Sequence, residues 1–318
     1  MQKTICEIFK QFGSFLTADA VICAGGLTVF GVWLIRTSLG RKALADSAPR
    51  GNNMPLYTPF IPLFIWLGSV SAASLITVEL LPELGDWQSA LLDQIILCTG
   101  AIAAIAVTIF LAKRTFAEEL KGFGLNIKTI HKDFFVAALN LFSVWPLVLL
   151  TVILTMHVGQ LIWGPDYNLQ QHEELKLIKE YSQLPVRILI IVTAATVAPV
   201  FEEMLFRGLF QTIIRTFLIR RQRFRIEPDP ILQAEVEMER PAQNEQVSAE
   251  TSNMAWPAIV ISSILFAMVH SNFGHWPALF VLAVCLGYSY EKSGSLLRPI
   301  FIHSFFNTAS ILATIYSA

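Results

Sequence analysis

The sequence predicts an all-α, polytopic membrane protein of about eight transmembrane helices, because its composition is apolar and long apolar runs alternate with loops of changing charge. Of the 318 residues, 54% are hydrophobic and 15% are charged. A soluble domain has roughly 25% charged residues. The mean hydropathy is +0.56. A chain this apolar cannot cover its surface with polar groups, which excludes an ordinary cytosolic enzyme and a disordered chain.

Apolar runs recur along the whole chain, and a helix needs about 20 mostly apolar residues to cross a bilayer. The runs are 18–35, 56–81, 89–112, 134–157, 186–219, 256–271, 276–290 and 299–316. Arg36 directly follows the first run, which lacks a small-x-small cleavage site, so we expect a retained anchor rather than a signal peptide. The run 186–219 would be about 51 Å long as a straight helix and must tilt, protrude or break, with Pro199 as the expected kink.

The loops between these runs alternate in charge, as the positive-inside rule requires. The basic loops are 36–50, 113–133, 220–255 and 291–298, and the loops that are not basic are 82–88 and 158–185. This alternation fits eight spans with both termini outside. Loop 220–255 begins with arginines but continues with acidic residues, and the net charge of the chain is −1, so we expect a cytoplasmic loop and no nucleic-acid binding.

Ionisable side chains inside an apolar run are costly and usually mark function. The longest run contains Glu202, Glu203 and Arg207. Glu203 and Arg207 are four residues apart, so they share a helix face and can form an ion pair. Glu202 is rotated by about 100° from Glu203 and is expected to point elsewhere. Because Arg207 pairs with one carboxylate, the other is a competent proton acceptor. A structural ion pair would explain Glu203 and Arg207 but not Glu202.

Two later runs carry polar side chains at helical spacing. Phe266 and His270 are four residues apart, as are His303 and Asn307, so each pair lies on one helix face. Alone, each pair has an ordinary explanation as an interfacial histidine or a polar contact between helices. Together with the carboxylates they form a set: a base to activate water, a histidine to shuttle its proton, and a His–Asn pair to hold an oxyanion. This is the chemistry of peptide-bond hydrolysis.

In this order, E-E-x-x-x-R, F-x-x-x-H and H-x-x-x-N resemble the motifs of the CPBP intramembrane proteases, also called the Abi or type II CAAX prenyl endopeptidase (CAAX prenyl protease 2) family. Residues 287–300 are similar to the family's glycine-containing stretch before its last histidine. The resemblance covers about residues 185–318. It implies that residues 181–318 form a protease core, with a cytoplasmic loop at about 220–255. From their apolar runs, residues 1–180 are expected to form N-terminal transmembrane helices and loops.

The resemblance also implies roles for individual side chains. Catalytic roles fall to Glu202, Glu203, His270, His303 and Asn307, and supporting roles to Arg207 and Phe266. The first glutamate would activate water, the second would pair with the arginine, the first histidine would polarise the water, and the last histidine and asparagine would form the oxyanion site. Glu202, His270 and His303 are also a plausible zinc set. The sequence has no H-E-x-x-H motif, and we favour the metal-free glutamate mechanism that the resemblance also implies.

The expected spans place the two histidines at different depths. His270 falls near the outer end of its run and His303 near the inner end of the last run, about 15–20 Å apart. This separation is too large for one site unless the short helices are shifted, broken or re-entrant, which a cavity-lining helix tolerates. We therefore expect the motifs to converge and the span boundaries to move.

The expected function is an intramembrane endopeptidase acting on a membrane-associated, CAAX-type protein or peptide in the cytoplasmic membrane of a bacterium. The expected partners are membrane lipid and this substrate. Two other functions remain open. One is a non-proteolytic scaffold or bacteriocin-immunity-type protein. The other is a transporter that uses Glu202, His270 and His303 as a proton relay, which predicts an inverted repeat that the sequence does not show.

Overall fold

The structure is a computed structural model that describes residues 18–81, 83–170, 173–226 and 254–316. All regular elements in these residues are helices, and their only β-type pairing is an isolated bridge between Asn52 and Phe116. The all-α prediction is therefore confirmed. The long helices are α2 (Ala18–Arg36), α3 (Phe60–Leu80), α4 (Asp86–Thr115), α6 (Ile130–Trp163), α10 (Thr212–Ile226), α13 (Ala255–Met268), α14 (Trp276–Ser293) and α15 (Leu297–Tyr316).

The remaining elements are shorter. They are α5 (Glu119–Phe123), α7 (Glu173–Glu180), α8 (Leu184–Val192), α9 (Ala198–Glu203), the 3-10 turns η1 (Ile127–Thr129) and η5 (Phe273–His275), and the π-helical segments η2 (Thr193–Val197) and η3 (Met204–Gln211). Elements α8, η2, α9, η3 and α10 follow one another without a gap and form one long helix. We call this the site helix.

Each of the apolar runs contains a helix. Five helices of the described chain are long and apolar enough to cross a membrane: Phe60–Thr77, Asp86–Thr115, Ile127–Trp163, Leu184–Gln222 and Phe273–Ser293. Two shorter apolar helices are Ala20–Arg36 and Ala255–Met268. The protein is thus an all-α polytopic membrane protein, and the number of eight spans stays a prediction.

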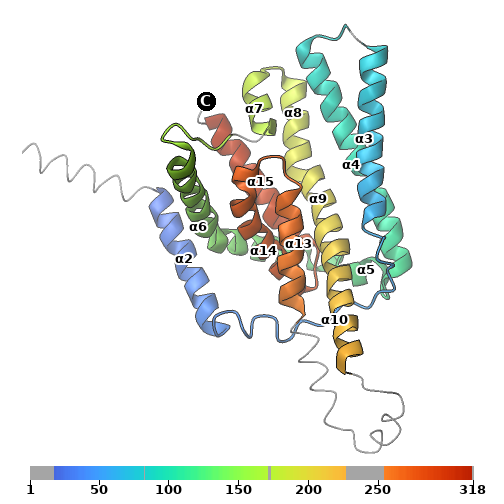
Figure 1. Ribbon diagram of the computed structural model, residues 1–318, viewed down its shortest axis with the longest axis vertical. Coiled ribbons are helices and arrows are strands. Elements are labelled where there is room, and N and C mark those ends of the chain that lie inside the picture. The colour runs from blue at the N-terminus through green and yellow to red at the C-terminus, as the bar shows by residue number, and fades with distance from the viewer. Residues whose placement is uncertain (1–17, 82, 171–172, 227–253, 317–318) are drawn as a thin grey trace, which may run out of the picture.

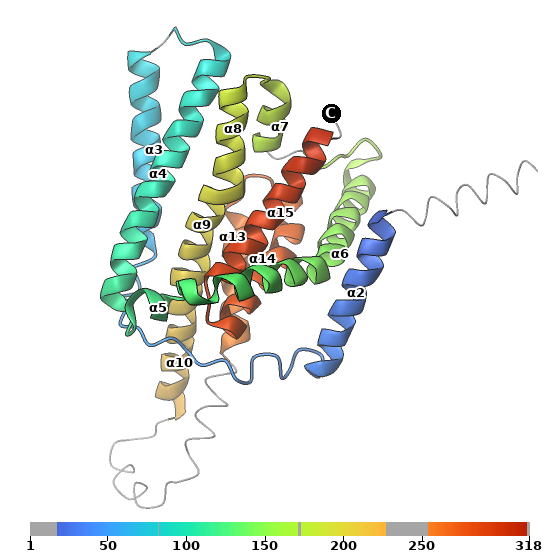
Figure 2. The ribbon, with the colours of Figure 1, turned by 180° about the vertical axis from the view of Figure 1, so that it is seen from behind.

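The site helix lies in the middle of the molecule, beside α13, α14 and α15 (Figures 1 and 2). The α3–α4 hairpin packs on one side of it through α4. On the other side, α6 packs against α14 and α15, and α2 packs against α6. The largest buried apolar cluster joins residues of α4, the site helix, α13 and α14, so the core lies around the site helix.

Three of the four basic loops gather at one end of the molecule, which we call the basic end. Arg50 Nη2 donates to the Tyr290 carbonyl at 2.9 Å, and Leu296 N donates to the Gly124 carbonyl at 2.8 Å. Gly124 has φ of 101°, and a Cβ there would lie 2.8 Å from Leu296 N, so this approach needs glycine. The start of α2 and the end of α15 lie at the opposite end (Figure 1). This arrangement agrees with the predicted charge alternation.

Two boundaries differ from the sequence-based expectation. The site helix continues to Ile226, so residues 220–226 of the predicted loop are helical, whereas residues 227–253 lie outside the described chain. Helix α13 ends at Met268, so His270 lies in the turn after the helix rather than within a span. The backbone hydrogen bonds of the site helix continue into the polar residues 220–226. Hydropathy alone does not detect a helix in such polar sequence.

Candidate active site

The two glutamates lie on α9, which is bounded on both sides by π-helical segments. π-Helical turns in α-helices occur frequently at functional sites. Pro199 explains the first of them, because proline lacks the N–H that an α-helix requires. Ala198 N donates to Thr193 O, five residues back. The same pattern would pair Ala194 O with residue 199, which has no N–H. Pro199 therefore shifts the hydrogen-bond pattern of the site helix without breaking it.

Asn307 supplies the missing donor for this carbonyl. Its Nδ2 donates to Ala194 O at 2.8 Å, from α15 to the site helix. A buried carbonyl without a donor would cost about 1–3 kcal/mol, so this contact stabilises the irregular turn ahead of the glutamates. One N–H of the Asn307 amide is therefore used structurally. The expected oxyanion role can involve only the other N–H of this group.

Glu203, Arg207 and His303 form a buried cluster. Arg207 Nε lies 3.1 Å from Glu203 Oε2, and both side chains are fully buried. His303 Nδ1 lies 2.9 Å from Glu203 Oε1. Arg207 also donates through Nη2 to the Ala283 carbonyl at 3.1 Å. The predicted ion pair of Glu203 and Arg207 is present, and the histidine of the last motif joins it.

Glu202 lies on the other side of the same imidazole. Its Oε2 is 3.9 Å from His303 Nε2, and its side chain is 25% exposed. Glu202 points elsewhere than Glu203, as the sequence predicts, yet it reaches the same histidine. Adjacent positions on α9 diverge, but His303 lies between them, so its two ring nitrogens face one carboxylate each. At 3.9 Å the contact is too long for a hydrogen bond. Glu202 Oε2 is buried and has no hydrogen-bond partner in the described chain.

Phe266 connects the second motif to this cluster. Its ring lies 5.7 Å from the His303 ring and 4.9 Å from the His270 ring, between centroids. The Arg207 guanidinium carbon lies 4.5 Å from the same phenyl centroid. Because both imidazoles contact one phenyl ring, the separation of about 15–20 Å expected from straight spans is wrong. The short α13 brings His270 back to the depth of His303.

His270 stands at the edge of the cluster. Its Nδ1 contacts the Phe266 carbonyl at 2.8 Å, which leaves Nε2 for another partner. The His270 carbonyl accepts a hydrogen bond from Trp276 Nε1 at 2.8 Å, which fixes the turn between α13 and α14. Among the described residues, His270 has no carboxylate within 4.0 Å, whereas His303 has two. The structure thus brings His303 to both glutamates and places His270 beside them through Phe266.

A metal site requires at least three ligands that converge. No group of three or more His, Cys, Asp or Glu side chains in the described part of the chain is arranged to hold a metal ion. His303 Nδ1 is committed to Glu203, and Glu202 and His270 do not meet. The set Glu202, His270 and His303 therefore does not fit a metal in this arrangement.

The sequence analysis missed a row of polar side chains on the site helix. Arg207, Gln211 and Arg215 follow one another at four-residue spacing and reach Ala283, Gly287 and Glu291 on α14. The offset between partners is constant because the two helices run parallel. A polar residue every four positions in an apolar run was the signal that could have revealed this face. We call this row the polar ladder.

Residues 184–309 match the model of a protein family described as "Type II CAAX prenyl endopeptidase Rce1-like". The match includes every residue of the cluster, from Glu202 to Asn307. It confirms the resemblance that the three motifs indicate. No curated protein and no solved structure matches the chain.

Proposed function

We infer that this chain belongs, through residues 184–309, to the Rce1-like, type II CAAX prenyl endopeptidase family. On this premise we propose that it is a membrane-embedded endopeptidase. It hydrolyses a peptide bond of a membrane-associated protein or peptide, with prenylated CAAX-type chains as the first substrates to test. The observation that supports this best is His303 held between two carboxylates: Glu203, which contacts His303 at 2.9 Å and Arg207 at 3.1 Å, and Glu202, which lies 3.9 Å from the other ring nitrogen. We place the enzyme in a bacterial cytoplasmic membrane.

In the proposed reaction, Glu202 is the base. A water molecule held between Glu202 Oε2 and His303 Nε2 would fit a gap of 3.9 Å, which is too long for a direct hydrogen bond. Glu202 accepts a proton from this water while the water oxygen attacks the scissile carbonyl. The proton then passes to the leaving nitrogen as the C–N bond breaks. General-base catalysis of this kind contributes about 10²–10⁴-fold to the rate.

The oxyanion of the intermediate needs a donor, and we assign this role to His303 Nε2, whose N–H donates to the bound water before the attack and to the carbonyl oxygen once the water has added. Nδ1 faces a carboxylate oxygen at 2.9 Å, so it carries a proton. Nε2 donates only when the ring is also protonated there. The proposed oxyanion role therefore requires a His303 ring that carries a proton on both nitrogens. The free N–H of Asn307 completes the oxyanion site. His270 reaches this cluster only through Phe266, so its expected role in polarising the water is left out of the proposed reaction.

The test is cleavage of a reconstituted membrane peptide by the purified full-length protein. Glu202→Gln keeps the shape of the side chain but removes the base, so we expect turnover to fall about 10²–10⁴-fold. Glu79→Gln is the matched control, because Glu79 is an exposed carboxylate at the end of the α3 span. Mass spectrometry of the products measures cleavage. A folded Glu202→Gln variant with full turnover would show that the proposed base is wrong.

Comparing prenylated and non-prenylated versions of the same peptide tests the proposed substrate class separately from the proposed catalytic mechanism. We expect faster cleavage of the prenylated peptide. Equal rates for both, with Glu202→Gln still inactive, would retain the glutamate mechanism and reject the CAAX-type substrate.

A further inference from the structure

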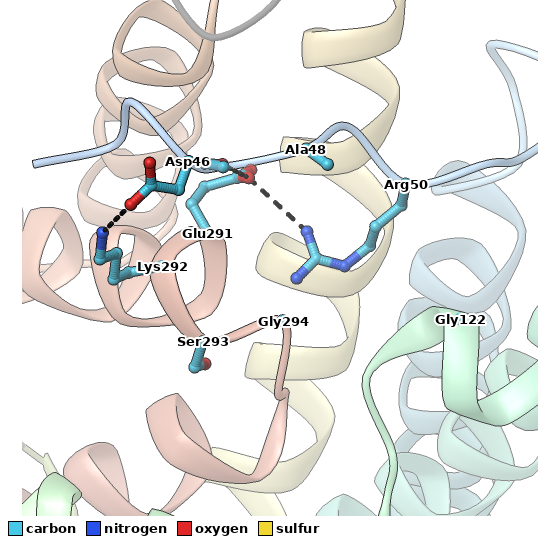
Figure 3. Close-up of a pocket in the computed structure, with 9 residues that line it drawn as sticks. Asp46, Ala48, Arg50, Gly122, Glu291, Lys292, Ser293 and Gly294 are labelled. Carbon is cyan, nitrogen blue, oxygen red and sulfur yellow. Dashed lines mark hydrogen bonds and ion pairs between the residues drawn. The ribbon is translucent and has the colours of Figure 1, made fainter.

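A second polar site lies at the basic end, away from the catalytic cluster. It is a pocket of about 280 Å³ between residues 46–50 and the last turn of α14 (Figure 3). Glu291 in its wall lies eight residues beyond Ala283, which contacts Arg207. Eight helical residues span about 12 Å, so the pocket and the catalytic cluster are at different depths.

The cations at this pocket and directly behind its wall, Arg50, Lys292 and Arg215, exceed the two carboxylates of the wall, Glu291 and Asp46, by one. Glu291 is buried and is paired with Arg215, whose Nη1 lies 2.5 Å from Glu291 Oε2. Gln211 donates to its other oxygen at 3.0 Å, and Ser47 donates to Oε2 at 3.3 Å. The carboxylate is thus fully used by these partners. Arg50, with Nη1 3.6 Å from Glu291 Oε2, adds a second cation to a carboxylate that one arginine already neutralises.

Arg50 presents hydrogen-bond donors to the pocket. Its side chain is 9% exposed, and its guanidinium lies 3.5 Å from the Tyr290 ring centroid, which fixes its plane. Of its five N–H groups, one donates to a described residue, through Nη2 to the Tyr290 carbonyl. On the opposite wall, Lys292 Nζ lies 3.5 Å from Asp46, a carboxylate that is 88% exposed (Figure 3). This exposed pair is easily separated, because surface ion pairs contribute about 0–1 kcal/mol.

We propose that this pocket binds a phosphate group, carried by an anionic lipid headgroup or by free phosphate. A rigid guanidinium fork fits phosphate oxygens in a bidentate way, and Lys292 adds a second cation at the rim. Basic pockets on the cytoplasmic side of helix bundles bind lipid headgroups. The pocket lies at the end of the molecule where the basic loops gather, which is where the headgroups of the inner leaflet would be. This site does not depend on the proposed hydrolysis.

Native mass spectrometry of the full-length protein in detergent tests the site. With added phosphatidylglycerol we expect one retained lipid per protein, and with phosphatidylcholine a much smaller fraction. Arg50→Gln should weaken retention by at least about tenfold, the effect of losing a charge-assisted contact. Arg50→Lys, which keeps the charge but not the fork, should be intermediate. Lys292→Gln removes a more exposed cation and provides a variant that folds even if Arg50 is needed for stability.

Arg41→Gln is the matched control, because Arg41 is an exposed arginine of the same loop outside the pocket. It should retain the lipid as the unmodified protein does. Inorganic phosphate in the same experiment separates the two sources: binding of phosphate without lipid would identify the free ion as the ligand. Equal retention by the unmodified protein, Arg50→Gln and Lys292→Gln, or equal retention of both lipids, would overturn the proposal.

Discussion

At the scale of single residues, the two adjacent glutamates have different environments. Glu203 is fully buried, with Arg207 Nε 3.1 Å from one of its oxygens and His303 Nδ1 2.9 Å from the other, whereas Glu202 is 25% exposed and lies 3.9 Å from His303. Moving a charged side chain from water into the protein interior costs free energy, so a buried charge persists only when it is paired. These environments agree with the proposal that Glu202 is the base and that Glu203 pairs with Arg207 and His303.

This difference predicts that substitutions of the two glutamates have effects of different size on stability. Glu203→Gln leaves the buried Arg207 charge without its partner, so the free energy of unfolding should fall by about 3–5 kcal/mol. Glu202→Gln should change it by less than about 1 kcal/mol. Denaturant unfolding in detergent micelles, followed by tryptophan fluorescence, measures both. Similar losses for the two variants would contradict the assignment of different roles.

At the scale of elements, the polar ladder holds the site helix and α14 in parallel register. Gln211 Nε2 reaches both the Gly287 carbonyl and Glu291, and Ser262 of α13 donates to Gln211 Oε1 at 3.1 Å. Small residues allow helices in membranes to approach closely, and Gly287 has this role here. A Cβ at this position would lie 2.6 Å from Gln211 Oε1 and 3.0 Å from Ile259 Cγ2.

Gly287→Ala should therefore destabilise the protein although alanine favours helices. We expect a loss of about 1–3 kcal/mol from overpacking. Gly31→Ala in α2 is the matched control, because nothing lies within 4 Å of a Cβ there. That variant should be neutral or more stable by up to about 1 kcal/mol. Unfolding curves of the two variants under the same conditions test this, and a stable Gly287→Ala variant would show that the ladder can shift without cost.

At the scale of the whole molecule, the basic loops define one end, and orientation in the membrane follows from it. The segment between α2 and α3 crosses this end and contacts the site helix, since Asn52 Nδ2 lies 3.1 Å from Thr216 Oγ1. An excess of Lys and Arg in short loops keeps them in the cytoplasm. The cluster of Glu202, Glu203, Arg207 and His303, which we propose to be catalytic, draws its first three residues from the candidate span Leu184–Gln222.

Labelling of single cysteines tests this orientation in intact cells. The four native cysteines are first replaced by serine or alanine. Cysteine is then introduced at Glu83, at the opposite end, or at Lys121, at the basic end; both side chains are exposed. A membrane-impermeant maleimide should label Glu83→Cys in intact cells and Lys121→Cys only after lysis. The reverse result would mean that the basic end faces outward.

The family match confirms the motif-based resemblance, and the helices confirm the fold class. The structure corrects the depth of His270, and it adds that Glu202 reaches the same histidine as Glu203. Hydropathy locates apolar runs, but it contains no information on where a helix stops when its neighbours satisfy its polar groups. Helical spacing gives the face of Glu202 relative to Glu203, but not that His303 lies between them. Arg215 and Glu291 are 76 residues apart, so no local pattern pairs them.

The sequence alone determined the membrane environment and the helical class, and it singled out the residues that we propose for catalysis, because these follow from composition and local spacing along one chain. Only the tertiary structure decided which side chains meet. A polar group buried in an apolar bundle must find its partner on another helix, and that choice depends on how all the helices pack. Glu203 with His303, Asn307 with Ala194, and Arg50 with Glu291 are therefore properties of the packed molecule.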